Sequence, residues 1–432
     1  MDSLVQDVFA AASTGDLDTI KRIYVRNFLD RDAQGRTPLM LAASRGHMAV
    51  IYFLSYLLNR EIDNSGRTAL MHAAIRGKAE AVAALVDLEN RMQDAEGMTA
   101  LMYAGMNNAP ECVKLLAPTE MAISDKTQTT ACMYSASAGC KEAVALLKDS
   151  EATYIDSKGR TALMYAAEKG QFECVSELLS AESRIQDDKG FTALMYAADG
   201  GHLECCERLV HREGRFQDAS GWTALMWACE KNHTKVARIL VDAEAKVQDT
   251  YGWTALMWAS DLNNYDIVRF LAPLEACKAD NSGKTAMMIA AEKGHLQSVE
   301  LLISREAGLG DRMERSALSY AAEKGFARVV ELLIEKEACL IDSRGMTALM
   351  YAVINSHTEC VRILAKKETR IVDVSLKTAL IHAVENGNAQ AVALLAEAEY
   401  DISDQSGKTP LMYARAQGNT PMCEMLMAVS DV

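Results

Sequence analysis

The sequence predicts an all-α fold, a solenoid in which short helix-turn-helix units stack on one another and are joined by extended fingers. One observation is the phrase G-x-T-A-L-M-x-A, which recurs unchanged or slightly altered from Gly35 to Gly407, always at 31 residues or a multiple of 31. A second is an aspartate that precedes the phrase in every unit, usually in a D-x-x-G turn. Regular repeats of about 20–50 residues are typical of solenoids. The repeat therefore predicts the architecture of nearly the whole chain.

The fold of one unit follows from its capping and turn residues. Thr161 precedes an apolar run and is expected to cap a first helix over residues 162–169, which Gly170 ends. A second helix is expected from about residue 172 to residue 180. Asp187 then begins the finger, where its carboxylate is expected to accept N–H groups of its own turn. Neither helix can bury its apolar face alone at this length, so each unit must stack on the next.

Composition excludes several classes of function. Lys+Arg is 45 and Asp+Glu is 59, a formal net charge of −14. So acidic a chain lacks the basic stripe that nucleic acids require, and it is not expected to bind anionic membranes. The N-terminal residues show no secretory signal, and no apolar run approaches the length of a membrane span. We therefore expect a cytoplasmic protein whose 11 cysteines are reduced structural thiols.

The repeated pattern resembles the ankyrin repeat, whose family phrase is G-x-T-P-L-H-x-A-A-x-x-G-H with V-x-x-L-L in the second helix. The family histidine is replaced by methionine in eleven units, as at Met164 and Met226. The resemblance divides the chain into a degenerate N-terminal capping repeat at 1–34, twelve ankyrin repeats at 35–406, and a C-terminal repeat acting as a cap at 407–432. The E-A ending and the T-A-L-M-Y-A-A opening look like the ankyrin-only proteins of diplomonad protists.

The resemblance implies an elongated, gently curved solenoid and a function in protein binding. Fingers and first helices would line the concave face, where partners of ankyrin repeats usually bind. On this basis we expect a monomeric, non-enzymatic scaffold or adaptor that binds a protein partner. The alternative is a structural component of a cytoskeletal or other large assembly, which would show a nearly uniform surface. A third reading, an enzyme, would need a segment outside the repeat register, and the sequence shows none.

Two recurring features bear on catalysis and metal binding. Glutamate ends the second helix in eleven consecutive units, from Glu89 to Glu399, and is expected to form a solvated, charged edge. Five of the eight histidines stand one to a repeat, just after the first helix, too far apart to share an ion. The sequence contains no phosphate-binding loop, dinucleotide fingerprint or nucleophile elbow. We therefore expect no catalytic residues, no metal and no cofactor.

The candidate partner-binding residues lie on central fingers. The residue between the glycine and the threonine of the phrase is aromatic in three adjacent units, as Phe191, Trp222 and Trp253, and Tyr251 lies beside Trp253. The side chains either form a binding hot spot, since tryptophan and tyrosine dominate such sites, or stack the fingers on one another for stability. Basic residues at the same place in flanking units, such as Arg160 and Lys284, would form a rim that favours an acidic or mixed partner.

Overall fold

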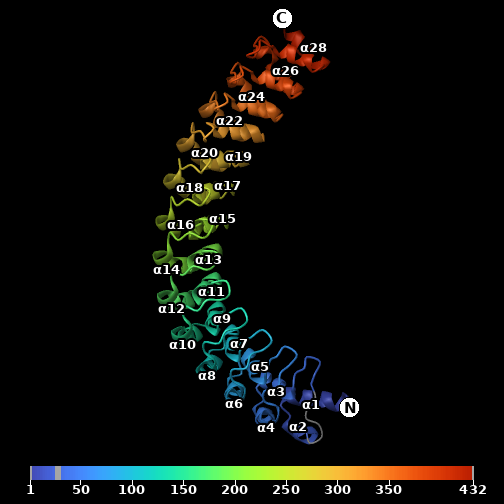
Figure 1. The fold of residues 1–432 in the computed structure, drawn as a ribbon, viewed down its shortest axis with the longest axis vertical. Helices are drawn as coiled ribbons and strands as arrows, with labels where there is room; N and C mark the ends of the chain where they lie inside the picture. Colours follow the sequence, from blue (N-terminus) through green and yellow to red (C-terminus); the bar gives the residue numbers. More distant parts are fainter. Residues whose placement is uncertain (1, 25–30, 431–432) are drawn as a thin grey trace. The chain divides into compact units, whose positions relative to one another are not determined.

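The computed structural model describes residues 2–24 and 31–430. In these residues it contains 28 helices and no β-strand, apart from the isolated bridges Ser124–Thr130 and Val372–Thr378. The helices come in pairs, and a finger joins each pair to the next (Figure 1). The chain divides into two compact units, one ending at Ala219 and the other beginning at Ser220. The predicted all-α repeat fold is therefore confirmed.

In the first unit the first helices of the repeats are α1 (Asp2–Thr14), α3 (Pro38–Arg45), α5 (Ala69–Ile75), α7 (Ala100–Met106), α9 (Ala131–Ala138), α11 (Ala162–Glu168) and α13 (Ala193–Asp199). The second helices are α2 (Leu17–Tyr24), α4 (Met48–Leu58), α6 (Ala79–Glu89), α8 (Pro110–Glu120), α10 (Lys141–Glu151), α12 (Phe172–Glu182) and α14 (Leu203–Glu213). Of the N-terminal capping repeat expected at 1–34, residues 1 and 25–30 lie outside the described residues.

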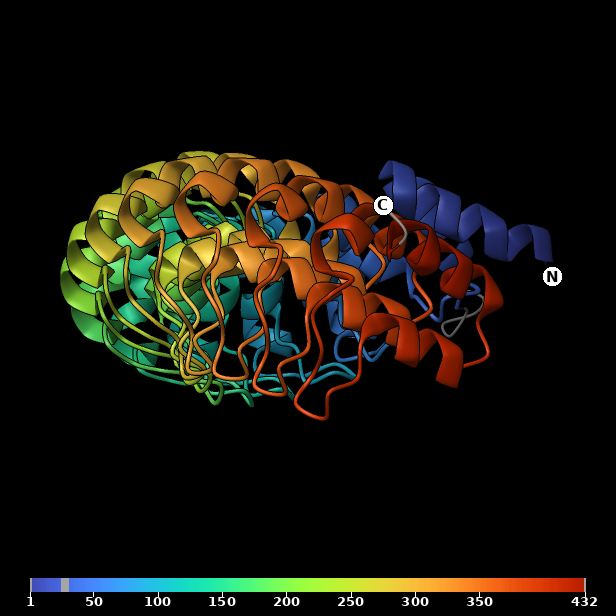
Figure 2. The same cartoon turned by 90° about the horizontal axis from the view of Figure 1, so that it is seen from above.

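In the second unit the first helices are α15 (Ala224–Glu230), α17 (Ala255–Asp261), α19 (Ala286–Lys293), α21 (Ala317–Lys324), α23 (Ala348–Ile354), α25 (Ala379–Glu385) and α27 (Pro410–Ala416). The second helices are α16 (Thr234–Glu244), α18 (Tyr265–Glu275), α20 (Leu296–Glu306), α22 (Ala327–Glu337), α24 (Thr358–Glu368), α26 (Ala389–Glu399) and α28 (Thr420–Ser430). Within each unit, first helices pack on first helices and second helices on second helices. The fingers project on one side of these two layers (Figure 2).

The predicted N-cap hydrogen bond forms in most repeats, although Thr130, Thr285 and Thr409 accept none. The Thr161 hydroxyl accepts the N–H of Met164 at 3.4 Å, and α11 begins at Ala162, directly after Thr161. The second helix, α12, ends at Glu182, two residues beyond the predicted end. The backbone after the first helix is left-handed in all thirteen units from the second onward, at Gly46, Gly77, Asn108, Gly139, Gly170, Gly201, Asn232, Asn263, Gly294, Gly325, Ser356, Gly387 and Gly418. Twelve of these first helices therefore stop in the conformation that their glycine or asparagine favours, and Ser356 adopts the same conformation in the other.

The glutamate that ends the second helix in eleven consecutive units is buried, contrary to the prediction of a solvated edge. We call these eleven residues the clamp glutamates; each is 2% exposed or less: Glu89, Glu120, Glu151, Glu182, Glu213, Glu244, Glu275, Glu306, Glu337, Glu368 and Glu399. Buried carboxylates are stable only when hydrogen bonds replace their hydration. The donors are backbone N–H groups, which a pattern of side chains does not reveal.

Within each compact unit, a clamp glutamate joins its own repeat to the one before it. Glu182 Oε2 accepts the N–H of Leu163 at 2.6 Å, at the start of α11, where helical N–H groups have no intrahelical partner. Its Oε1 accepts the N–H of Thr153 at 3.2 Å, in the linker that follows the preceding second helix. Thr153 is left-handed, with φ +69°. Burial raises the pKa of Glu182, although the two N–H groups and the Thr161 hydroxyl lower it.

Replacing a clamp glutamate by its amide is expected to destabilise the stack. In Glu182→Gln the amide NH₂ would face a backbone N–H, so one buried donor loses its acceptor, at a cost of about 1–3 kcal/mol. The measurement is the midpoint of urea denaturation followed by circular dichroism. Glu173→Gln, on the same helix and with a side chain 60% exposed, is the control and should change the midpoint little. Equal midpoints for the two variants would contradict the clamp.

Candidate partner-binding site on the fingers

Each finger is closed by its aspartate. Asp156 Oδ1 accepts the N–H groups of Lys158 and Arg160, both at 2.8 Å, and the N–H of Gly159 bonds the Asp156 carbonyl at 3.0 Å. The predicted turn is thus confirmed. Successive fingers are also joined by single backbone bonds, such as that from the N–H of Asn281 to the carbonyl of Tyr251 at 3.0 Å.

The second oxygen of the finger aspartate binds the side chain nine residues later, on the first helix. The Tyr165 hydroxyl donates to Asp156 Oδ2 at 2.8 Å. Burial and this bond raise the pKa of Tyr165 to about 12. Equivalent contacts are made by Tyr103, Tyr134, Tyr196, Tyr320, Tyr351, Tyr413, Trp258, His72 and His382. The polar atoms of these first-helix side chains therefore anchor the fingers.

The residue between glycine and threonine covers this ring. Where it is arginine, its guanidinium lies over the tyrosine, 4.2 Å from the ring centroid for Arg160 and Tyr165. Where it is aromatic, the two rings lie tilted against each other, with centroids 5.2 Å apart for Phe191–Tyr196, 4.7 Å for Trp222–Trp227 and 4.6 Å for Trp253–Trp258. Each of the three predicted aromatic residues therefore packs against a first-helix ring of its own repeat, and Trp222 also contacts Trp258 of the next repeat, which agrees with a stabilising role.

The flanking basic residues do not support the predicted preference for an acidic or mixed partner. Arg160 pairs with Asp156 at 3.0 Å and with Glu168 at 3.5 Å. Lys284 pairs with Glu292 at 2.7 Å. Both cations are already engaged by carboxylates of their own repeats, so they do not form a rim that requires negative charge from a partner.

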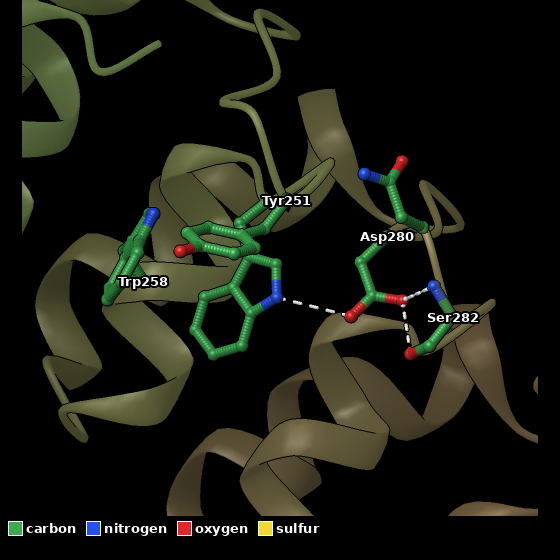
Figure 3. Close-up of a pocket in the computed structure, with 6 residues that line it drawn as sticks. Tyr251, Trp258, Asp280 and Ser282 are labelled. Carbon is green, nitrogen blue, oxygen red and sulfur yellow. Dashed lines mark hydrogen bonds between the residues drawn. The ribbon is translucent and has the colours of Figure 1, made fainter. Parts of the chain in front are cut away.

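A pocket opens in the second unit where the aspartate contact is altered. In most repeats the residue nine positions after the finger aspartate is tyrosine, tryptophan or histidine. After Asp280 it is Ile289, whose side chain has no polar atom that could bond the carboxylate. The indole Nε1 of Trp253, on the preceding finger, donates instead to Asp280 Oδ2 at 3.1 Å. The pocket has a volume of about 430 Å³ and is lined by Tyr251, Trp253, Trp258, Asp280, Asn281 and Ser282. Figure 3 shows Tyr251 and Trp258 on one side of it, with Asp280 and Ser282 opposite.

The structure brings together only some of the candidate residues. Tyr251 and Trp253 line the pocket, and Tyr251 is 69% exposed. Trp222 contacts the same Trp258 ring, with centroids 4.3 Å apart, but does not line the pocket. Phe191 belongs to the first unit. Sequence reasoning missed Asp280 as a site residue, because its role depends on Ile289, which has no donor for the carboxylate. The only sequence signal is that isoleucine replaces the usual tyrosine, tryptophan or histidine nine residues after the aspartate.

Several histidines bond backbone carbonyls, and several cysteines are buried in the core. Nε2 of His202 lies 3.0 Å from the Glu168 carbonyl of the preceding repeat, and His47, His295 and His357 make the same contact. Cys174 is buried, as predicted, and burial raises the pKa of its thiol to about 12. Among the described residues, no group of three or more His, Cys, Asp or Glu side chains could hold a metal ion. None of the described helices is both long and apolar enough to cross a membrane.

The paired helices, the fingers and the repeat phrase define a repeat protein, and comparison with known families identifies the class. The family described as ankyrin repeats (3 copies) matches residues 8–92, 88–157, 146–217, 211–280, 242–312, 287–375 and 367–432. The chain therefore belongs to the ankyrin-repeat family, whose members generally serve as protein–protein interaction modules and are typically not catalytic. No curated protein matches the chain.

The finger aspartates should make stability depend on pH. Burial alone would raise the pKa of Asp156, but bonds from the Arg160 N–H, the Tyr165 hydroxyl and the Lys158 N–H hold it below the ordinary value. Because the folded pKa lies below the unfolded value of about 3.9, the stabilisation is present above that pH and is lost as pH falls through the folded pKa. Asp156→Asn should therefore lower the melting temperature at neutral pH, and the gap from the native chain should close as pH falls through this range.

The measurement is thermal unfolding of both chains from neutral to acidic pH. Asp188→Asn, an exposed residue on a neighbouring finger, is the control and should melt like the native chain. A gap between Asp156→Asn and the native chain that does not change with pH would contradict the assignment.

Proposed function

We propose that the chain is a non-enzymatic scaffold or adaptor that binds a partner protein through its fingers, with Tyr251 and the adjoining rings as the anchor. The observation that carries this proposal is the exposed Tyr251 side chain at the edge of a pocket walled by Trp253 and Trp258. A rigid aromatic wall with a few polar groups is the form that binding sites commonly take. Trp222 would extend the contact to the neighbouring finger of the same unit, and Phe191 stays a separate candidate contact in the first unit.

The alternative, a structural component of a large assembly, loses its main support. That reading expects a nearly uniform surface, which a solvated glutamate edge would partly have provided, and the clamp glutamates are buried. A local pocket at Tyr251 instead favours one defined docking position. We further propose a cytoplasmic monomer with capping repeats at 1–34 and 407–432, and a relationship to diplomonad ankyrin-only proteins based on the E-A and T-A-L-M-Y-A-A phrases.

Site-specific cross-linking in the native cell tests the proposal. A photoreactive benzoylphenylalanine replaces Tyr251 in one chain and Tyr56 in a second chain. Tyr56 is the control because it is 80% exposed on α4 and does not lie on a finger. We expect a discrete cross-linked partner from position 251 and none of the same mass from position 56.

A second arm separates binding from folding. Tyr251→Ala should weaken capture of that partner by about tenfold or more, the usual effect of truncating a hot-spot residue. The melting temperature should stay the same because the side chain is mostly exposed. Trp253→Ala is less selective, since it also removes the bond to Asp280. Partner capture that survives Tyr251→Ala would refute the proposed anchor.

A further inference from the structure

We propose that the pocket at Tyr251 receives a positively charged side chain, lysine or arginine, from a basic segment of the partner protein. This inference rests on the proposed function and names the chemistry of the partner. It differs from the expectation of an acidic or mixed partner that the sequence suggested. The argument comes from the way other repeats of this chain satisfy the same carboxylates and rings.

In several repeats the finger supplies its own cation. Lys284 pairs with Glu292 at 2.7 Å, and its ammonium lies 4.3 Å from the centroid of the Tyr320 ring. The same spacing of eight residues joins Arg160 to Glu168, Arg315 to Glu323 and Lys377 to Glu385. In these repeats a cation from the finger both covers a first-helix ring and neutralises a first-helix carboxylate.

The two tryptophan repeats lack this cation. Trp222 and Trp253 occupy its place, and the acids eight residues later are Glu230 and Asp261. Their partners are lysines from first helices, Lys231 at 3.3 Å and Lys293 at 3.0 Å, both with half-exposed side chains. Exposed pairs of this kind contribute little to stability. This stretch therefore presents rings and carboxylates without the finger cation that accompanies them elsewhere.

Asp280 supplies the carboxylate inside the pocket. Its Oδ1 accepts the N–H and hydroxyl of Ser282, both at 2.7 Å, and the N–H of Lys284 at 2.9 Å. The bond from Trp253 uses one acceptor position of Oδ2, and a carboxylate oxygen has two. The Lys284 ammonium is engaged by Glu292 and the Tyr320 ring.

A cation in this pocket would interact with the aromatic rings and with the Asp280 carboxylate at the same time. It would lie against the faces of Tyr251 and Trp253 and donate to Asp280 Oδ2, a combination of cation–π attraction and a charge-assisted hydrogen bond. The formal net charge of −14 would also attract a basic partner over longer distances. Charge and pocket chemistry thus favour the same class of side chain.

Intrinsic fluorescence provides the test, because the four tryptophans of the chain are Trp222, Trp227, Trp253 and Trp258, all in these two repeats. Short glycine peptides with one central arginine or lysine are titrated into the full chain at low salt, beside matched peptides with citrulline or acetyl-lysine. We expect at least one charged peptide to change the emission saturably and to bind about fivefold or more tightly than its neutral match.

Two variants and one control locate the effect. Asp280→Asn and Tyr251→Ala should each reduce binding of the charged peptide to near the level of the neutral one. Asp311→Asn changes the equivalent finger aspartate of the next repeat, which has a finger cation, Arg315. This variant should leave binding unchanged. If Asp280→Asn lowers the melting temperature, the exposed Tyr251 still provides a test without a folding defect.

Equal binding of charged and neutral peptides, or no saturable binding of either charged peptide, would overturn the inference. So would charged-peptide binding that survives both variants. The proposed function is judged separately by cross-linking: a partner captured at position 251 that competes with none of the charged peptides leaves the scaffold role standing and rejects the cationic side chain.

Discussion

The stack depends on one interaction above all, the buried carboxylate that ends eleven of the second helices. Glu182 links three segments, its own helix, the start of α11 and the left-handed linker of the repeat before it. The donors stand 19 and 29 residues earlier in the chain. The same two spacings recur at Glu89 and at Glu399. An inserted residue between carboxylate and donor would misplace the clamp, which gives a physical reason for the strict 31-residue period.

The fingers are held by a second, more variable set of contacts. The aspartate closes the turn with one oxygen and holds a first-helix side chain with the other, as Asp156 does with Tyr165. The covering residue can be a cation or an aromatic ring, as Arg160 and Phe191 show. Because either kind satisfies the packing, this position can change the surface chemistry of a finger while the clamp below it stays the same.

Much of this fold could be predicted from the sequence, because capping, helix stops and turns are local. Thr161 and the left-handed stop at Gly170 follow from the preferences of those residues. The burial of Glu182 could not, since its donors are backbone groups from distant segments, and a recurring charged residue usually indicates solvent. At the site, recurrence identified Tyr251 and Trp253, but the role of Asp280 depends on a contact between fingers.

The clamp also bears on how such a chain can grow. A unit of 31 residues with a clamp glutamate carries one carboxylate that reaches back to its predecessor and one left-handed linker N–H, such as that of Thr153, that its successor can bind. A duplicated unit therefore already contains both groups of the contact, the carboxylate that bonds the unit before it and the linker N–H that the unit after it can bond. Gene duplication could lengthen the array without compensating substitutions, leaving later divergence to the fingers, and the near-identity of the G-x-T-A-L-M-x-A phrase across the units agrees with such a history.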